Sequence, residues 1–391
     1  MNILHISPYF PDMNENHAGG VCMGKQIETL RKRHNVYVLT FIASEFDKKI
    51  AKKYEDHLNY KTVSINRWTR LVHVLIEPFL PNFFAARSSI RFAFYLVRMI
   101  KKHHIHAIHA EYASMGQYFW IVKALFPSVK IHLIEHDITI QSYKRKMEQT
   151  SGIKRWYFMW QCKRILRAEG KYCNLADVIL TFNTKDSDLI KRYYKRADVI
   201  VINPYYGIED HSINARSENY QYGTICFMGQ MGRAENYEAA DRLIQISKKV
   251  KKKIPELEVY IIGNNPPEEL KKKENDFIHV TGFVENVDQY LVQCQVAVFP
   301  LTLGAGIKLK VLRSLALGVP VITSGIGAEG IDEDGEVIVL AETDGEFENS
   351  LEELIMNYNK SKKLSEKSRR FVQERFGWCM SEKLLGELYK E

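Results

Sequence analysis

Short apolar runs alternate with longer amphipathic segments along the 391-residue chain. The chain opens with an apolar run at Asn2–Ser7, a helical pattern that extends to about Arg33, and a second apolar run at Asn35–Phe41. Strands this apolar are buried on both faces, and intervening helices join parallel strands. The pattern therefore predicts an α/β fold. The same pattern predicts further strands at 106–110, 131–134, 178–182 and 199–202, and helices at 114–126 and 155–173.

The alternation pauses at Asn203–Gly207 and then starts again. A repeated alternation with a Pro/Gly break, in a chain too long for one core, predicts two Rossmann-like, doubly wound domains. Their boundaries fall at about 1–205 and 206–372. Ligands of such sheets bind at the carboxyl ends of the strands, so we expect a site in a cleft where the two sheets face each other. The second half has predicted strands at 224–228, 258–262, 277–280, 296–299 and 320–323, and predicted helices at 238–252, 287–294 and 307–317.

The segment Arg70–Lys102 is unusually apolar and contains Phe83, Phe84, Phe92 and Phe94. We expect a buried helix preceded by an apolar lead-in. An element that touches a membrane is the alternative.

Composition narrows the class of protein. A content of 46% hydrophobic and 26% charged residues is typical of a soluble globular protein. The sequence contains neither an apolar run of about eighteen residues nor an N-terminal secretory signal, which predicts a cytoplasmic protein. The six scattered cysteines form no C-x-x-C pair, so we expect buried, reduced thiols. The net charge of +8 favours an anionic partner, whether nucleotide, lipid or nucleic acid.

A glycine-rich turn follows the predicted strand that ends at Phe299. Gly304 and Gly306 allow backbone N–H groups to point at an anion, the next helix presents the positive end of its dipole, and Lys308 is expected in its first turn. Together they predict a cradle for a diphosphate. The pattern matches neither the dinucleotide fingerprint nor the P-loop. The alternative is that the glycines only form the turn.

Two further glycine-bearing segments follow the first strands of the two halves. In the second half, Gly229 is followed by Arg233, whose guanidinium is suited to the same phosphates, although a surface arginine is the alternative. In the first half, Gly19 and Gly20 lie in a predicted loop, where they would let the backbone approach a ligand closely.

These residues resemble the retaining glycosyltransferases of the GT-B fold, and specifically glycosyltransferase family 4. The resemblance extends over nearly the whole chain and rests on the order and spacing of its motifs. Beyond the glycines already named, the matching segments are Glu135–Asp137, Ala176–Thr181, Phe227–Gly229, Val280–Val284, Gly304–Leu312, Ala316–Thr323 and Gly325–Gly330.

The resemblance implies that the second domain holds a nucleotide-sugar donor, that the first holds a glycan or lipid-linked acceptor, and that the anomeric configuration is retained. It places Gly282 and Phe283 beside the nucleobase, and Arg233 and Lys308 at the diphosphate, where they stabilise the leaving group. It implies that residues 373–391 form a terminal helix that crosses back onto the first domain. It also implies donor-sugar or ribose contacts for Gly327, Ala328 and Glu329, and a catalytic position for His136, next to Asp137.

Asp137 has two open readings from the residues alone: it orients His136, or it caps the following helix.

One departure from the family concerns two glutamates that many relatives carry. Ala305 and Arg313 stand at those positions here, and the second removes the usual ribose-binding carboxylate. Either Glu329 compensates, or the donor differs, or the site is degenerate. The last possibility corresponds to a non-catalytic GT-B protein that binds a glycan or a partner.

We predict no catalytic metal and no cofactor. Histidines 103, 104, 106 and 109 are close in sequence, but odd spacing on a strand sends side chains to opposite faces. The Asp-x-Asp segments at Asp186 and Asp332 are expected at a helix start and in a loop before a strand at Glu336. Neither position suits metal chemistry.

Basic residues surround Trp156, Tyr157, Phe158 and Trp160 in the segment 144–167. Such a segment binds an anionic membrane surface or single-stranded nucleic acid, or forms a solvated helix with a buried aromatic face. The resemblance supports peripheral membrane contact and gives no support to nucleic acid. It also implies a role in bacterial surface-polysaccharide or glycolipid synthesis, at the inner face of the cell membrane.

Overall fold

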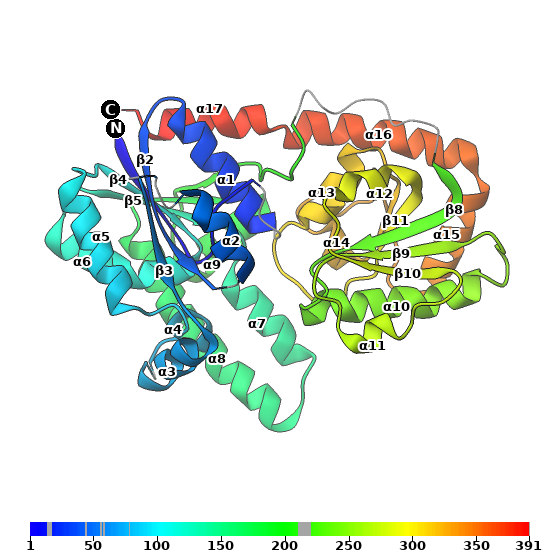
Figure 1. Cartoon of the computed structure of the whole chain (residues 1–391), viewed down its shortest axis with the longest axis horizontal. Helices are drawn as coiled ribbons and strands as arrows, with labels where there is room; N and C mark the ends of the chain where they lie inside the picture. The colour runs from blue at the N-terminus through cyan, green and yellow to red at the C-terminus, as the bar shows by residue number, and fades with distance from the viewer. Residues whose placement is uncertain are drawn as a thin grey trace. The chain divides into compact units, whose positions relative to one another are not determined.

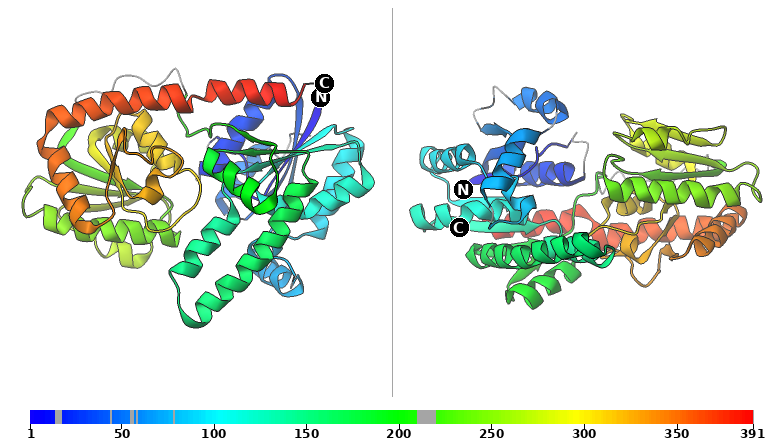
Figure 2. Two further views of the ribbon diagram at one scale, coloured as in Figure 1. Left: turned by 180° about the vertical axis from the view of Figure 1, so that it is seen from behind. Right: turned by 90° about the horizontal axis from the view of Figure 1, so that it is seen from below.

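The computed structural model describes residues 1–13, 18–43, 45–54, 57, 59–77, 79–209 and 220–390. The chain forms two compact units (Figure 1). Unit 1 contains Met1–Pro204 and Cys379–Glu391, and unit 2 contains Tyr205–Trp378. Each unit is built on a parallel β-sheet, and helices flank each sheet on both faces (Figure 2). The predicted α/β fold with two doubly wound sheets is confirmed.

The sheet of unit 1 has seven parallel strands in the order β3-β2-β1-β4-β5-β6-β7. Its inner strands are the apolar runs of the sequence, because both of their faces are covered by helices. The edge strand β3 was not predicted from the sequence. The strands are β1 (Asn2–Ser7), β2 (Asn35–Ile42), β3 (Tyr60–Ser64), β4 (Ala107–Glu111), β5 (Lys130–Glu135), β6 (Val178–Thr181) and β7 (Val199–Val201).

The first helix of unit 1 corrects one prediction. Gly19 and Gly20 lie in the first turn of α1 and not in a loop. The predicted loop before them includes residues 14–17, which lie outside the described residues. The helices of unit 1 are α1 (Ala18–Arg31), α2 (Glu45–Ala51), α3 (Arg67–Ile76), α4 (Asn82–Ala85), α5 (Ile90–Lys102), α6 (Phe119–Leu125), α7 (Thr139–Glu148), α8 (Gly152–Leu175), α9 (Thr184–Tyr194) and α17 (Trp378–Leu388), with short 3₁₀ turns η1 (Lys52–Tyr54) and η2 (Ala113–Tyr118).

The apolar segment between residues 70 and 102 was only partly interpreted correctly. Helix α5 buries one face through Phe92 and Leu96, as expected. Helix α3, in contrast, has no buried residue, so the apolar stretch of Arg67–Ile76 before α5 is not part of the core as this prediction implied. A similar correction applies to α8, because Trp156 and Trp160 are exposed and the helix has no fully buried aromatic face at its start.

The sheet of unit 2 has six parallel strands in the order β10-β9-β8-β11-β12-β13. The edge strand β13 corresponds to the strand that was expected near Glu336. The strands are β8 (Gln221–Met228), β9 (Glu258–Ile262), β10 (Ile278–Gly282), β11 (Cys294–Phe299), β12 (Val321–Thr323) and β13 (Ile338–Leu340). The helices are α10 (Ala234–Val250), α11 (Glu268–Lys271), α12 (Val287–Gln293), α13 (Leu309–Ala316), α14 (Gly325–Ala328), α15 (Asp344–Met356) and α16 (Tyr358–Phe376).

Each unit has an apolar core packed against its sheet, and in unit 1 a smaller separate cluster forms around Phe10, Ile42 and Ile50. Five cysteines are buried, as expected, and none of the six forms a disulfide among the described residues, whereas Cys379 is exposed. Among the described residues, no helix is both long enough and apolar enough to cross a membrane.

Candidate functional site

In unit 2 the loop between β11 and α13 forms a tight, glycine-dependent turn. Gly304 and Gly306 have φ values of +136° and +63°, a region that side chains rarely tolerate. Lys308 is the N-cap of α13, one residue before the helix, and not in its first turn as predicted. Its Nζ donates hydrogen bonds to the carbonyls of Ala305 (3.1 Å) and Gly306 (2.5 Å). The ammonium group therefore lies over the turn that was predicted to bind an anion.

Lys310 is a second cation beside this turn, and the sequence analysis missed it. Its Nζ donates to Oδ1 of Asn236 at 2.7 Å and lies 4.4 Å from the ring centre of Phe227. Burial, together with the positive charges of Lys308 and Arg233, lowers the pKa of Lys310 to about 7. The signal in the sequence was a second lysine two residues after Lys308, at the same helix start.

Arg233 and Gly229 contribute to the same edge of the sheet. Arg233 is the N-cap of α10, is 62% exposed, and forms an ion pair with Glu235 at 2.5 Å. Gly229 follows β8, and a Cβ there would lie 2.9 Å from the side chain of Asn236. Gly229 thus leaves space for the amide that holds Lys310.

Three more predicted residues stand at the end of β12. Gly327 and Ala328 are buried in α14, and a Cβ on Gly327 would lie 1.9 Å from Oγ1 of Thr323. The Glu329 carboxylate is almost fully buried, and its Oε2 lies 3.8 Å from Nζ of Lys308. The structure therefore brings Glu329 next to the predicted diphosphate cradle.

The predicted nucleobase residues lie at the end of β10. Gly282 is the last residue of that strand and has a φ of +67°. Phe283, which follows it, is 57% exposed and so presents an accessible ring. The glycines and cations of unit 2 all stand at the carboxyl edge of one parallel sheet, where ligands of such sheets bind.

Arg313, the residue that replaces the family glutamate, has a partner within unit 2. Its guanidinium donates two hydrogen bonds to the carboxylate of Asp288, from Nε to Oδ1 (2.6 Å) and from Nη2 to Oδ2 (3.0 Å). Paired, planar geometry of this kind is the strongest arrangement for arginine and a carboxylate. The charge of Arg313 is therefore balanced within the fold.

In unit 1, His136 lies just after β5 and is held by Glu111, the last residue of β4. Its Nε2 lies 2.6 Å from Oε2 of Glu111. The ring stacks on Tyr112 with centres 4.0 Å apart and meets the edge of Phe182 at 4.8 Å. Asp137 does not cap the next helix, because the N-cap of α7 is Ile138 and no side chain caps it. Glu111, which the sequence analysis missed, orients the histidine.

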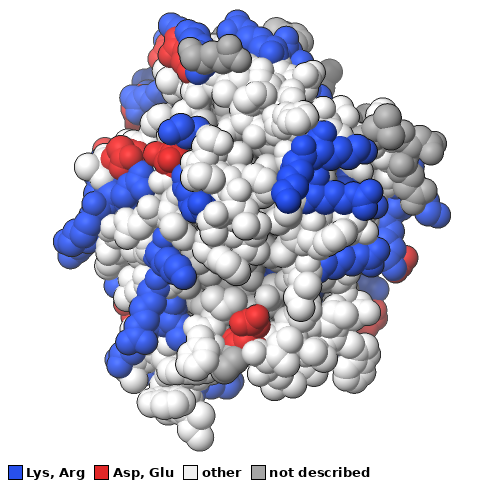
Figure 3. Space-filling view, turned by 90° about the vertical axis from the view of Figure 1, so that its left-hand side faces the viewer, with Lys and Arg blue, Asp and Glu red and all other residues white. Residues whose placement is uncertain are grey.

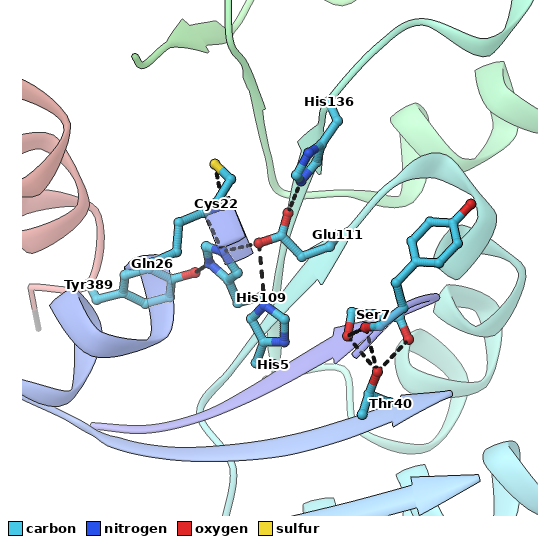
Figure 4. Close-up of polar contacts among 10 residues, drawn as sticks. His5, Ser7, Cys22, Gln26, Thr40, His109, Glu111, His136 and Tyr389 are labelled. Atoms are coloured by element: carbon cyan, nitrogen blue, oxygen red, sulfur yellow. Dashed lines mark hydrogen bonds and ion pairs between the residues drawn. The ribbon is translucent and has the colours of Figure 1, made fainter. Parts of the chain in front are cut away.

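Glu111 also belongs to a buried polar network (Figure 4). Its Oε1 lies 3.3 Å from Nε2 of His5 and 3.1 Å from Nε2 of His109. His109 Nε2 also lies 2.9 Å from Oε1 of Gln26, so this nitrogen faces two acceptors and must carry the proton. His109 Nδ1 then accepts from the hydroxyl of Tyr389 at 2.6 Å. The contacts around His109 are thus satisfied by hydrogen bonds alone.

Glu111 stays ionised in this interior. Burial by itself would raise its pKa, but hydrogen bonds from His109, His136 and His5 lower the pKa well below its usual value. Burial lowers the pKa of His5, which fits a neutral ring. His5, His109 and Glu111 each offer one atom that could bind a metal ion, and these atoms lie within 4.8 Å of one another. This is the only possible metal-binding group of three or more such residues among the described residues. Nε2 of His5, Nε2 of His109 and Oε1 of Glu111 are joined by hydrogen bonds, whereas Nδ1 of His5 is buried without a partner.

The Asp-x-Asp segments have structural contacts. Asp186 stands in the first turn of α9 and accepts from Nδ2 of the N-cap residue Asn183 at 2.7 Å. Asp332 accepts hydrogen bonds from the backbone N–H groups of Glu336, Val337 and Ile338. Both carboxylates organise the local backbone.

The arrangement can be compared with known proteins. Residues 222–357 match the family described as glycosyl transferases group 1. HepE of Anabaena, crystallised with UDP and glucose, shares 14% identity over 99% of both chains with a TM-score of 0.70. Sucrose-phosphate synthase from Thermosynechococcus elongatus shares 16% identity over 99% of this chain and 98% of its own, with a TM-score of 0.72. A mutant of S. aureus TarM, in complex with fondaparinux, alpha-GlcNAc-glycerol and UDP, shares 11% sequence identity over 100% of both chains with a TM-score of 0.67. No curated protein sequence matches the chain.

The chain has the GT-B fold. These likenesses cover the whole chain, whereas the family match covers most of unit 2. The predicted resemblance of this GT-B chain to the glycosyl transferases group 1 is therefore confirmed, and the matched segment lies within unit 2. The predicted donor residues of unit 2 lie within or close to the matched segment.

Proposed function

We propose that this GT-B protein is a glycosyltransferase that transfers a sugar from a nucleoside-diphosphate donor with retention of configuration. The observation that carries the proposal is the set of three cations, Lys308, Lys310 and Arg233, gathered at the carboxyl edge of one sheet beside the turn at Gly304–Gly306. Three cations near one another repel, so a bound diphosphate would stabilise them and would in turn be stabilised as a leaving group.

Residues at the same edge of the sheet offer contacts for the base and the sugar of the donor. We propose that the nucleobase stacks near Phe283, and that the ribose or the sugar contacts Glu329 and the backbone of Gly327 and Ala328. Uridine is the first base to test, because HepE and TarM were crystallised with UDP.

For unit 1 we propose the acceptor site and a catalytic contribution from His136, held by Glu111. The acceptor would be a glycan or a lipid-linked sugar, as in bacterial surface-polysaccharide or glycolipid synthesis at the inner face of the cell membrane. We propose that transfer needs no metal, because lysine and arginine can supply the charge that a divalent cation supplies elsewhere.

The test is calorimetric titration with UDP and UDP-sugars, with and without EDTA. We expect binding that EDTA leaves unchanged and that Lys308→Ala weakens by about 100-fold. Lys252→Ala is the matched control, since Lys252 is an exposed lysine after α10, at the opposite edge of the same sheet. Wild-type protein that binds none of the nucleotides, or a Lys308→Ala variant that binds as wild type, would refute the donor site.

Retention is tested separately on the product. Proton NMR of freshly formed product should show the anomeric configuration of the donor sugar. An inverted anomer would contradict the retaining mechanism but would not contradict the donor site.

A non-catalytic binding protein is the second candidate, because Arg313 stands where the family carries a glutamate. The paired contact of Arg313 with Asp288 argues against a stray cation in the site. Tight UDP binding without transfer or hydrolysis of any UDP-sugar would favour this candidate.

A further inference from the structure

Helix α3 exposes its apolar face. Trp68, Leu71, Val72, Leu75 and Ile76 recur at spacings of three and four residues, which places them on one side of the helix. Their exposed fractions lie between 51% and 76%. In a helix of a soluble protein this is the side that normally packs onto the core.

The polar side of α3 faces the protein instead. Nε of Arg70 and Nδ1 of His73 are both shielded from solvent. The helix begins with a capping box, in which Asn66 and Thr69 each bond the other's backbone N–H. The helix is thus well formed, and its orientation leaves the apolar side outward. A contiguous apolar face of this kind marks a binding surface.

The start of α8 extends this surface. Trp156 and Trp160 are exposed, and the guanidinium of Arg164 lies 4.2 Å from the ring centre of Trp160. Arg164 also donates to the carbonyls of Glu77 and Leu80, which follow α3 and flank the almost fully exposed Phe79. These contacts fix the end of α3 against α8, and both helices lie along the same lower edge of unit 1 in Figure 1. We name the outward residues Trp68, Leu71, Leu75, Phe79, Trp156 and Trp160 the α3–α8 surface.

The charge around this surface is positive. Neither Arg67–Ile76 nor Gly152–Ala168 contains an acidic residue, and Lys154, Arg155 and Lys163 are exposed. Unit 1 as a whole carries 34 Lys and Arg against 20 Asp and Glu, while unit 2 carries 21 against 27. Figure 3, which looks onto unit 1, shows abundant Lys and Arg and few Asp and Glu. Unit 1 therefore carries the net positive charge of the chain, whereas unit 2 is net negative.

We propose that the α3–α8 surface docks unit 1 onto an anionic lipid membrane. The aliphatic side chains of α3 enter the boundary between headgroups and acyl chains, the tryptophans lie at the level of the headgroups, and the cations of α8 contact lipid phosphates. The combination favours a lipid surface over a second copy of the chain, because identical basic surfaces repel each other. The contact is peripheral and is independent of the proposed sugar transfer.

The test is co-sedimentation with vesicles of phosphatidylcholine, alone or mixed with phosphatidylglycerol. We expect binding only to the anionic vesicles, and we expect high salt to weaken it. The triple variant Trp68→Ser, Leu71→Ser, Leu75→Ser should lose binding by more than about tenfold. The matched control is Trp120→Ser with Leu125→Ser on α6, where both side chains are 57% exposed. Circular dichroism should show that both variants remain folded.

The charges are tested in the same way. Lys154→Glu with Arg155→Glu should weaken binding to anionic vesicles by more than about tenfold, whereas Lys101→Glu with Lys102→Glu, at the exposed end of α5, should change it much less. Equal binding to neutral and anionic vesicles, no binding to either, or wild-type binding by the triple variant would overturn the proposal. So would a wild-type dimer in light scattering that the triple variant abolishes, because the surface would then join two copies of the chain.

Discussion

Replacing Lys310 with methionine is expected to stabilise unit 2 at neutral pH and to weaken the binding of nucleoside diphosphates. Methionine has a similar length but no charge. Lys310 has its Nζ against Asn236 and above the ring of Phe227, with the charges of Lys308 and Arg233 nearby. The lysine is thus held in a position that costs stability and that suits an anionic ligand.

The magnitude follows from the pKa. A pKa lowered from 10.5 to about 7 corresponds to about 5 kcal/mol against the charged form. Lys310 keeps some contact with solvent, which screens part of this free-energy cost. The methionine variant also loses the hydrogen bond to Asn236 and the contact with the Phe227 ring. We therefore expect a net stabilisation of about 2 kcal/mol at pH 7.

The stability effect of Lys310 changes with pH in a defined direction. Because the pKa of Lys310 is lower in the folded state, the unfolded chain binds this proton more tightly. Lys310 therefore destabilises the folded state less and less as the pH rises from about 7 to 10.5. The advantage of Lys310→Met should shrink over the same range.

The assay is urea unfolding of wild type, Lys310→Met and the control Lys252→Met at pH 7 and pH 10, with UDP calorimetry at pH 8. A bound diphosphate should raise the pKa of Lys310, so wild-type binding should take up a proton, which two buffers of different ionisation heat reveal. The reasoning is refuted if Lys310→Met is less stable than wild type at pH 7, or if the gap between them is the same at both pH values.

Three other changes have defined outcomes. Glu111→Gln should lower sugar transfer by about 100-fold while UDP affinity stays the same, because it disturbs the hydrogen bond that holds His136 in unit 1; an equal loss of UDP affinity would contradict this. Glu135→Gln should stabilise the protein above pH 7, because burial raises the pKa of Glu135 well above its usual value and burial likewise raises the pKa of its neighbour Glu169 to about 7. Both carboxyl groups therefore lose stability as the pH rises above about 4.5, and pH-dependent unfolding checks this. Gly263→Ala should destabilise unit 2 by at least about 3 kcal/mol, because its φ is +146° and a Cβ would lie 1.7 Å from a backbone carbonyl oxygen; thermal unfolding near the wild-type temperature would contradict this.

The inner strands were predictable because their chemistry is local. A strand covered on both faces must be apolar along its length, and β1 was predicted with its observed bounds. The edge strand β3 was missed because its sequence Tyr-Lys-Thr-Val-Ser alternates with exposed polar residues and buries only Val63.

The site was predictable only in part. Glycines and Lys308 form a continuous segment, so their spacing in the sequence carries the signal. Glu111 and His136 lie 25 residues apart and meet because β4 and β5 are neighbours whose carboxyl ends share an edge. Tyr389 reaches His109 from near the other end of the chain. Such pairs depend on strand order, which no local pattern encodes.

The sequence by itself determined which segments are apolar, how strands and helices alternate, and how many positive charges the chain carries. The tertiary structure alone decided which way those segments face. The pattern of α3 is the same whether its apolar side packs inward or outward, because amphipathic spacing fixes a helix face but not its neighbour. In the same way, two lysines two residues apart carry no sign of which one contacts Asn236 and Phe227, because those residues belong to other elements.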